Sequence, residues 1–202
     1  MAWLLRESFD RPAMDPRLGW FNPPPQWQVD AHRRLLEVRP SGGTDFWQQT
    51  HYDFRADNGH FLFLPVETDF AMITRVEFQP VHQDDQAGLM VRYGPECWMK
   101  TSVEHEPDGP AKLGVVVTQQ GYSDWSTQDF VAPKRELSLR ITRKGDDYAV
   151  EASVEATRWT QIRLTHLAGP TEGGHLQCGL YACSPKGSGF VARFSCLEIE
   201  TL

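Results

Sequence analysis

The chain has 202 residues, enough for one substantial core, and its 27 acidic residues against 20 basic ones give a formal net charge of -7. That negative field repels polyanions, so neither nucleic acid nor an anionic membrane surface is expected as a partner. No apolar run approaches the roughly 20 residues needed to span a bilayer, and the first apolar patch ends at Leu5. We therefore expect a cytoplasmic protein with a single domain over residues 1–202.

The first forty residues are predicted to wrap the edge of a sheet. A proline-rich turn, Asn22 to Pro25, is followed by Trp27 and by the strand-like run Leu35 to Val38. Apolar residues continue through this region and low-complexity sequence is absent, which argues against a linker.

The segment 44–60 concentrates aromatic, histidine and aspartate residues between two predicted strands. Rings supply contact area and short polar groups fix orientation, so this composition favours a surface that holds a polar ligand with an apolar face. His51, Asp57 and His60 could form a metal triad. The stronger interpretation is a turn at Asp57 and hydrogen-bonded histidines at strand ends, so no metal site is predicted.

From residue 60 onward, apolar and polar residues alternate with the period of half-buried strands. The clearest runs are residues 87–93, 137–142 and 148–155, separated by turn sequences such as Tyr93-Gly94-Pro95 and Lys144-Gly145-Asp146-Asp147. Helical periodicity is almost absent. The pattern predicts an all-β fold, a two-sheet antiparallel jelly-roll sandwich, with a closed barrel as the alternative.

The segment from Cys97 to Glu106 has one face that is unusually polar for a strand. Residues two apart share a face, so Trp98, Lys100 and Glu104 lie together, opposite Met99. Three residues of other segments have the parity to lie beside them on neighbouring strands: Arg92, Thr118 and Arg140. These residues could line a groove; the alternative is a solvated face with exposed ion pairs that contribute little stability.

Signals for catalysis are weak. Glu104 and Glu106 have a spacing near that of a glycosidase carboxylate pair, but Pro107 follows and places Glu106 in a turn. Ser123 to Ser126 reads as a polar loop without a nucleophile elbow. No cofactor motif is present. The four cysteines lack paired spacing and are expected to be reduced and buried, with a Cys178–Cys196 disulfide as the competing interpretation.

Several segments occur in the order found in a known family: TDFWQQTHYDFRADNGHF from Thr44, DQAGLMVRY from Asp85, CWMKTSVE from Cys97, VVVTQQGYSDWS from Val115 and LSLRITRKGD from Leu137. The chain closely resembles the family of small proteins that carries the label "regulation of enolase protein". The resemblance implies a concanavalin A-like lectin/glucanase fold, in which a concave sheet face binds sugars in many relatives. Glucanases of this fold carry an E-x-D-x-E motif that is not present here, so the resemblance does not imply hydrolysis.

The leading hypothesis is a non-catalytic protein that binds a sugar or other polar small molecule, without a cofactor. Its predicted ligand-binding residues are Trp47, His51, His60, Arg92, Trp98, Lys100, Glu104, Asp124, Trp125 and Arg140. One alternative is a glycan-active enzyme with Glu104 as acid or base and Lys100 or His60 as its partner. Another is an interaction module that regulates a metabolic enzyme through exposed aromatics. The oligomeric state is not decided by the sequence.

Overall fold

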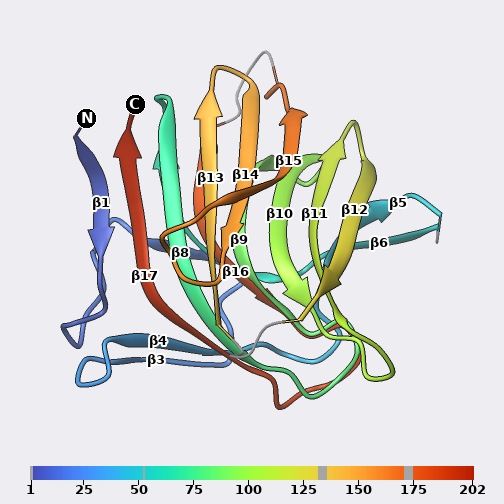
Figure 1. The fold of residues 1–202 in the computed structure, drawn as a ribbon, viewed down its shortest axis with the longest axis horizontal. Coiled ribbons are helices and arrows are strands. Elements are labelled where there is room, and N and C mark those ends of the chain that lie inside the picture. The colour runs from blue at the N-terminus through green and yellow to red at the C-terminus, as the bar shows by residue number, and fades with distance from the viewer. Residues whose placement is uncertain (1, 52, 132–135, 171–174) are drawn as a thin grey trace.

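The chain folds entirely into strands and loops in the computed structural model, which describes residues 2–51, 53–131, 136–170 and 175–202. Two large antiparallel sheets pack face to face, and a small hairpin extends beside them (Figure 1). The prediction of an all-β two-sheet sandwich is confirmed, because each sheet keeps two separate edges instead of closing into a barrel. Over these ranges the chain offers no helical segment with the length and hydropathy to cross a membrane.

Both large sheets mix strands from distant parts of the chain, and their order follows the hydrogen-bonded pairs of the described residues. The first sheet runs in the order β15 (Thr160–His166), β14 (Asp147–Ser153), β13 (Glu136–Lys144), β8 (Phe70–Gln79), β17 (Val191–Thr201), β4 (Leu35–Arg39) and β3 (Gln26–Asp30), with β1 (Trp3–Glu7) also paired to β17. The second sheet runs in the order β12 (Tyr122–Phe130), β11 (Ala111–Gln119), β10 (Cys97–Glu104), β9 (Gln86–Gly94), β16 (Leu176–Cys183), β7 (His60–Val66) and β2 (Gly19–Phe21). The hairpin consists of β5 (Phe46–Gln49) and β6 (Phe54–Asp57).

The N-terminal region completes the edges of both sheets, as predicted. Strands β3 and β4 extend the first sheet beyond β17, and β2 forms the end of the second sheet beside β7. The two chain ends lie side by side (Figure 1), where the Thr201 amide donates to the Ala2 carbonyl at 2.8 Å. These additions leave fewer unpaired backbone groups at the sheet edges.

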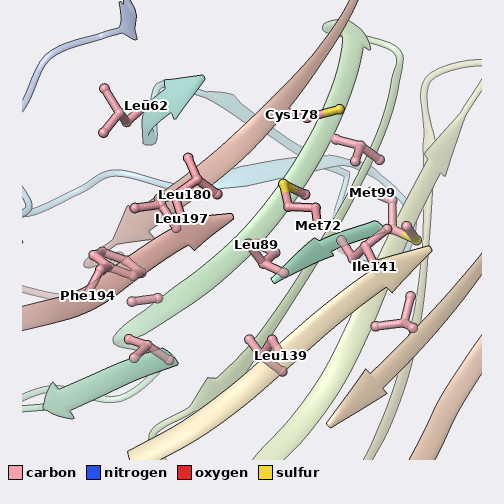
Figure 2. Packing of buried hydrophobic residues seen from close by; sticks show 14 of the residues in the cluster. Leu62, Met72, Leu89, Met99, Leu139, Ile141, Cys178, Leu180, Phe194 and Leu197 are labelled. Carbon is pink, nitrogen blue, oxygen red and sulfur yellow. The ribbon is translucent and has the colours of Figure 1, made fainter. Parts of the chain in front are cut away.

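The main core fills the space between the two sheets. Leu89 and Met99 project into it from the second sheet, and Leu139 and Ile141 project from the first (Figure 2). Each is fully buried, which is worth about 1.5–3 kcal/mol for a side chain of this size. The period-two alternation predicted these inward positions correctly.

Close strand packing requires glycine at one position of this second sheet. A Cβ atom at Gly88 would lie 2.0 Å from the Thr101 carbonyl oxygen, well inside contact distance. A side chain on β9 at this point would separate β9 from β10, so the register of the site-bearing strands depends on this glycine.

The cysteines are free thiols, as predicted. Cys178 lies on β16 in the core, whereas Cys196 lies on β17 in the other sheet, so the alternative of a disulfide between neighbouring strands is wrong. Burial raises the pKa of the Cys178 thiol well above its usual range. These cysteines act as small apolar residues.

The polar loop predicted at Ser123 to Ser126 is a strand. This segment belongs to β12, the edge strand next to β11, where Ser123 pairs with Thr118 and Trp125 pairs with Val116. Most of its side chains are polar and at least partly exposed, and only Trp125 and Phe130 pack against the apolar clusters. The apolar alternation that marks a half-buried strand was therefore missing.

Candidate functional site

The outer face of the second sheet carries a second apolar cluster, separate from the main core. Its buried members are Phe46, Trp47, Phe61, Met90, Trp98, Val116, Tyr181 and Cys183. The first two come from the β5–β6 hairpin and the rest from the sheet. The hairpin therefore covers part of a face that would otherwise meet water.

Specific contacts hold the hairpin on the sheet. The Phe46 ring packs 6.0 Å from the Trp98 ring, centroid to centroid. The backbone amide of Gln48 donates to Ser123 Oγ at 2.9 Å, and the Arg92 guanidinium donates to Asp57 Oδ2 at 2.8 Å. The hairpin is therefore held by apolar packing and by a hydrogen bond or ion pair at each end.

A cavity of about 540 Å³ lies where the hairpin, strands β10 and β11 and two loops meet. That size suits a small organic ligand. Its lining residues are Asp45, Trp47, Phe54, Gln83, Asp84, Gln86, Lys100, Glu104, Glu106, Val116, Trp125, Pro185 and Lys186. The wall mixes aromatic rings with charged groups, as predicted for this face.

Lys100 is the buried cation of the cavity, with a 3 % exposed side chain. Its ammonium donates to Asp45 Oδ1 at 2.9 Å and to Gln86 Oε1 at 2.8 Å. Tyr181 donates its hydroxyl to the same Gln86 oxygen at 3.1 Å. Burial alone would lower the pKa of Lys100, but the attraction of Asp45 and other acidic groups outweighs it and the pKa is raised. Lys100 is therefore a fixed positive charge at neutral pH.

Glu104 is the buried acid of the cavity. It is 9 % exposed, and its carboxyl oxygens open to the cavity and form no hydrogen bond within the described part of the chain. Burial raises its pKa to about 8, although Lys100 opposes the shift, and Asp45, Asp84 and Glu106 add to it. At neutral pH the carboxyl is mostly protonated and can both donate and accept hydrogen bonds.

Aromatic rings form the remaining walls. Trp47 is held by its indole N–H, which donates to the Thr50 carbonyl at 3.2 Å. Trp125 lies over Gly114, where a Cβ atom would be 2.8 Å from the indole nitrogen. Phe54 is 47 % exposed at the rim. Rings in these positions offer flat apolar surfaces to a ligand ring.

Four residues predicted from the sequence line this cavity together: Trp47, Lys100, Glu104 and Trp125. Trp98 belongs to the same face but is fully buried beneath the hairpin. His60 is also buried, and its ring bonds to the Asn22 carbonyl and the Ser41 amide instead of facing the cavity. Burial lowers the pKa of His60, which keeps the ring neutral.

The other predicted residues lie outside the cavity. Arg92 is buried in its bond to Asp57, Asp124 pairs with Arg163 at 3.0 Å, and His51 is exposed at the hairpin turn. The predicted placement of Arg140 beside Lys100 is wrong. Arg140 lies on β13 in the other sheet and binds Glu151, because strand parity sets the face of a sheet but not which sheet a strand joins.

Several cavity residues were not singled out from the sequence: Asp45, Asp84, Gln86 and Lys186. Gln86 had a usable signal, because it shares the outward parity of Met90 on β9 and lies opposite Glu104 in the register. Asp45, Asp84 and Lys186 lie outside the strands, where alternation gives no direction.

No metal centre is found among the described residues. The proposed triad does not assemble, because Asp57 binds Arg92 and His60 uses both ring nitrogens for backbone groups. This bears out the hydrogen-bonded interpretation of His60 made from the sequence.

The two-sheet sandwich and its cavity-bearing outer face define a concanavalin A-like β-sandwich. Within that class, the chain belongs to the family described as "Protein of unknown function (DUF1349)", whose match covers residues 20–202. It is 36% identical over 178 residues to "Regulation of enolase protein 1" from Saccharomyces cerevisiae, a match covering 87% of this chain and 85% of that protein. The family expected from the sequence motifs is confirmed.

Solved structures give the same fold. The crystal structure of a functionally unknown protein from Saccharomyces cerevisiae has a TM-score of 0.84 and 31% identity, covering 92% of this chain and 97% of that one. The GH43 BlXynB protein from Bacillus licheniformis has a TM-score of 0.79 and 18% identity; the match covers 98% of this chain but 39% of that protein. The second likeness concerns the fold alone.

Proposed function

We propose that the cavity between the β5–β6 hairpin and strands β10 and β11 binds a carbohydrate or similar polar metabolite without chemical change. The observation that carries this proposal is the pairing of ring walls with buried polar groups at one cavity. Trp47 and Trp125 would stack on the apolar face of a sugar ring, while Glu104 and Gln86 would exchange hydrogen bonds with its hydroxyls. The role of Lys100 is to fix Gln86 and Asp45 in place.

The test is a titration of the purified protein with a panel of neutral sugars, amino sugars and sugar acids, followed by tryptophan fluorescence. We expect saturable binding that Trp125→Ala weakens about tenfold, which corresponds to about 1.4 kcal/mol. Trp3→Ala is the matched control, because Trp3 is 49 % exposed on β1, far from the cavity lining. Absence of binding across the panel would contradict the proposal.

A second candidate is acid catalysis on a glycan. The supporting observation is Glu104, whose pKa of about 8 keeps a proton available at neutral pH, with Glu106 lining the same cavity. A general acid needs this protonation state. Turnover of a chromogenic glycoside that is lost in Glu104→Gln but kept in Glu106→Gln would replace the binding proposal with this one.

A third candidate follows from the name of the yeast relative, which presents it as a regulator of enolase. An interaction module of that kind would use the exposed Phe54 at the cavity rim as an anchor. Sedimentation of the protein with purified enolase, with and without Phe54→Ala, tests this candidate. Co-sedimentation that the substitution abolishes would support it.

A further inference from the structure

The charged groups of the cavity are unequal in number. Among its described lining residues, four carry carboxyl groups and two carry ammonium groups: Asp45, Asp84, Glu104 and Glu106 against Lys100 and Lys186. Lys100 is already paired with Asp45. Burial raises the pKa of Asp84, and the attraction of Lys186 opposes the shift. Lys186 attracts Asp84 but forms no ion pair within the described residues, and Lys100 also attracts Glu104 while it is bound to Asp45, so the carboxyl groups of this wall outnumber the ammonium groups.

Glu104 adds an independent sign that a ligand group belongs here. Its side chain is more than nine-tenths buried and lines the cavity, and the described residues form no hydrogen bond with its carboxyl, whose oxygens open to the cavity. A buried polar group without a partner costs free energy unless something in the cavity satisfies it. Whatever fills the cavity supplies that partner: water in the free protein and a ligand group in the complex.

The charges around Glu104 come from every element that packs against it. They are Lys100 on its own strand, Asp45 before β5, Asp84 before β9, Glu106 after β10 and Lys112 opposite on β11. The ammonium of Lys112 is already bound to Asp129 at 2.5 Å. The remaining imbalance is acidic and favours an incoming positive charge.

We propose that the ligand of this cavity is an amine-bearing sugar or a closely similar polar ring compound, whose ammonium group lies between Glu104 and Glu106. The inference rests on the proposed binding function and specifies its ligand class. The aromatic walls fit the same ligand, since Trp47, Phe54 and Trp125 attract both a sugar ring and an organic cation. A metal ion fits less well, because the described carboxyl groups form no metal-binding cluster.

Binding of such a ligand is coupled to a proton. Glu104 is mostly protonated in the free protein at pH 7, because burial raises its pKa to about 8. An ammonium group beside it favours the carboxylate, so the protonated acid and the ammonium give an ion pair plus one released proton. Affinity for the amine therefore rises from pH 6 toward pH 8, as long as the amine itself stays charged.

The experiment compares three β-1,4-linked disaccharides that differ only at C2: cellobiose with a hydroxyl, di-N-acetylchitobiose with an acetamide, and the glucosamine dimer with an ammonium. Calorimetry at pH 7 in two buffers of different ionisation enthalpy measures both affinity and proton release. We expect the glucosamine dimer to bind at least tenfold more tightly than the other two, with a substantial fraction of one proton released per ligand.

Two variants identify the groups responsible. Glu106→Gln, at a partly exposed position just after β10, should reduce the preference for the glucosamine dimer over cellobiose. Glu104→Gln should abolish the proton release. Calcium chloride should not compete with the glucosamine dimer, and competition would overturn the inference in favour of a metal site.

The outcomes separate the two proposals. If cellobiose binds as tightly as the glucosamine dimer, the amine inference is wrong and the binding function stands. If the amine dimer binds more tightly but Glu106→Gln leaves the preference intact, the assignment of the ammonium position is wrong. If none of the three disaccharides binds, the amine inference is wrong. If no sugar of the wider panel binds either, the proposed binding function is wrong as well.

Discussion

Replacing Glu104 with glutamine should stabilise the protein at neutral and alkaline pH. The carboxyl has its pKa raised from 4.5 to about 8 by burial. Below the unfolded pKa the acid is protonated in both states and has no effect on stability. Between the two pKa values the unfolded chain loses the proton and the folded chain keeps it, so stability falls as pH rises.

The size of the effect follows from the same two pKa values. Each pH unit between them costs about 1.4 kcal/mol, which gives roughly 3 kcal/mol at pH 7 and roughly 5 kcal/mol at pH 9. Glutamine keeps the size of the side chain and cannot ionise, so Glu104→Gln should recover most of this loss. For a chain of this length, roughly 3 kcal/mol corresponds to a rise in melting temperature of about 6–12 °C.

Urea unfolding of the wild type and of Glu104→Gln at pH 5, 7 and 9 measures this difference directly. The gain should be small at pH 5 and should grow through pH 9. Glu67→Gln is the control, because Glu67 is exposed in the loop after β7, and it should leave the pH dependence of the wild type unchanged. A difference between Glu104→Gln and wild type that stays constant across these pH values would refute the assignment of Glu104 as a buried, protonated acid.

Three further predictions concern the frame around the cavity. Lys100→Met should destabilise the protein by about 3–5 kcal/mol in urea unfolding, because it removes the cation from the partly buried Asp45 carboxylate. Adding Asp45→Asn to this variant should restore at least half of the lost stability. A double variant as unstable as Lys100→Met alone would contradict this explanation. Gly88→Ala should lower the free energy of unfolding by about 1–3 kcal/mol and lower the melting temperature accordingly. Gly94→Ala on the same strand should change the melting temperature little, because a Cβ atom there meets nothing within 4 Å. Equal effects of the two substitutions would refute the packing argument. The native protein should react slowly with a thiol reagent at pH 8, since burial raises the pKa of each cysteine. All four thiols should react once the protein is unfolded in the absence of a reductant.

The strands of the sandwich could be read from the sequence because one physical rule controls them. A half-buried strand must alternate, so the inward positions of Leu89 and Leu139 follow directly from the order of residues. Edge strand β12 did not obey the rule, since Trp125 is the only large apolar residue among its outward positions and only Phe130 of its inward positions packs against the main core. The pattern therefore failed where burial on both sides was small.

The site was predicted in part, for a related reason. Lys100 and Glu104 share a strand, and their common face could be inferred from parity alone. The inclusion of Arg140 failed because no local rule assigns a strand to one sheet or the other. The burial of Trp98 was missed because it depends on the β5–β6 hairpin, which folds over the sheet. The nearest residue of that hairpin in sequence, Asp57, is 41 positions from Trp98.

The hairpin that hides Trp98 also makes the cavity a preformed one. Moving it away would expose Phe46, whose burial is worth a few kcal/mol at about 25 cal/mol per Å², and would break the bond between Arg92 and Asp57. The wall that carries Trp47 is therefore held in place by contacts that do not involve a ligand. Because the ring surface and Glu104 already face the same space, a ligand need not spend binding free energy on ordering the chain. Selectivity among ligands should then depend on the charge and hydrogen-bonding groups that meet Glu104, which is why ligands that differ at a single substituent are the sharpest probes of this site.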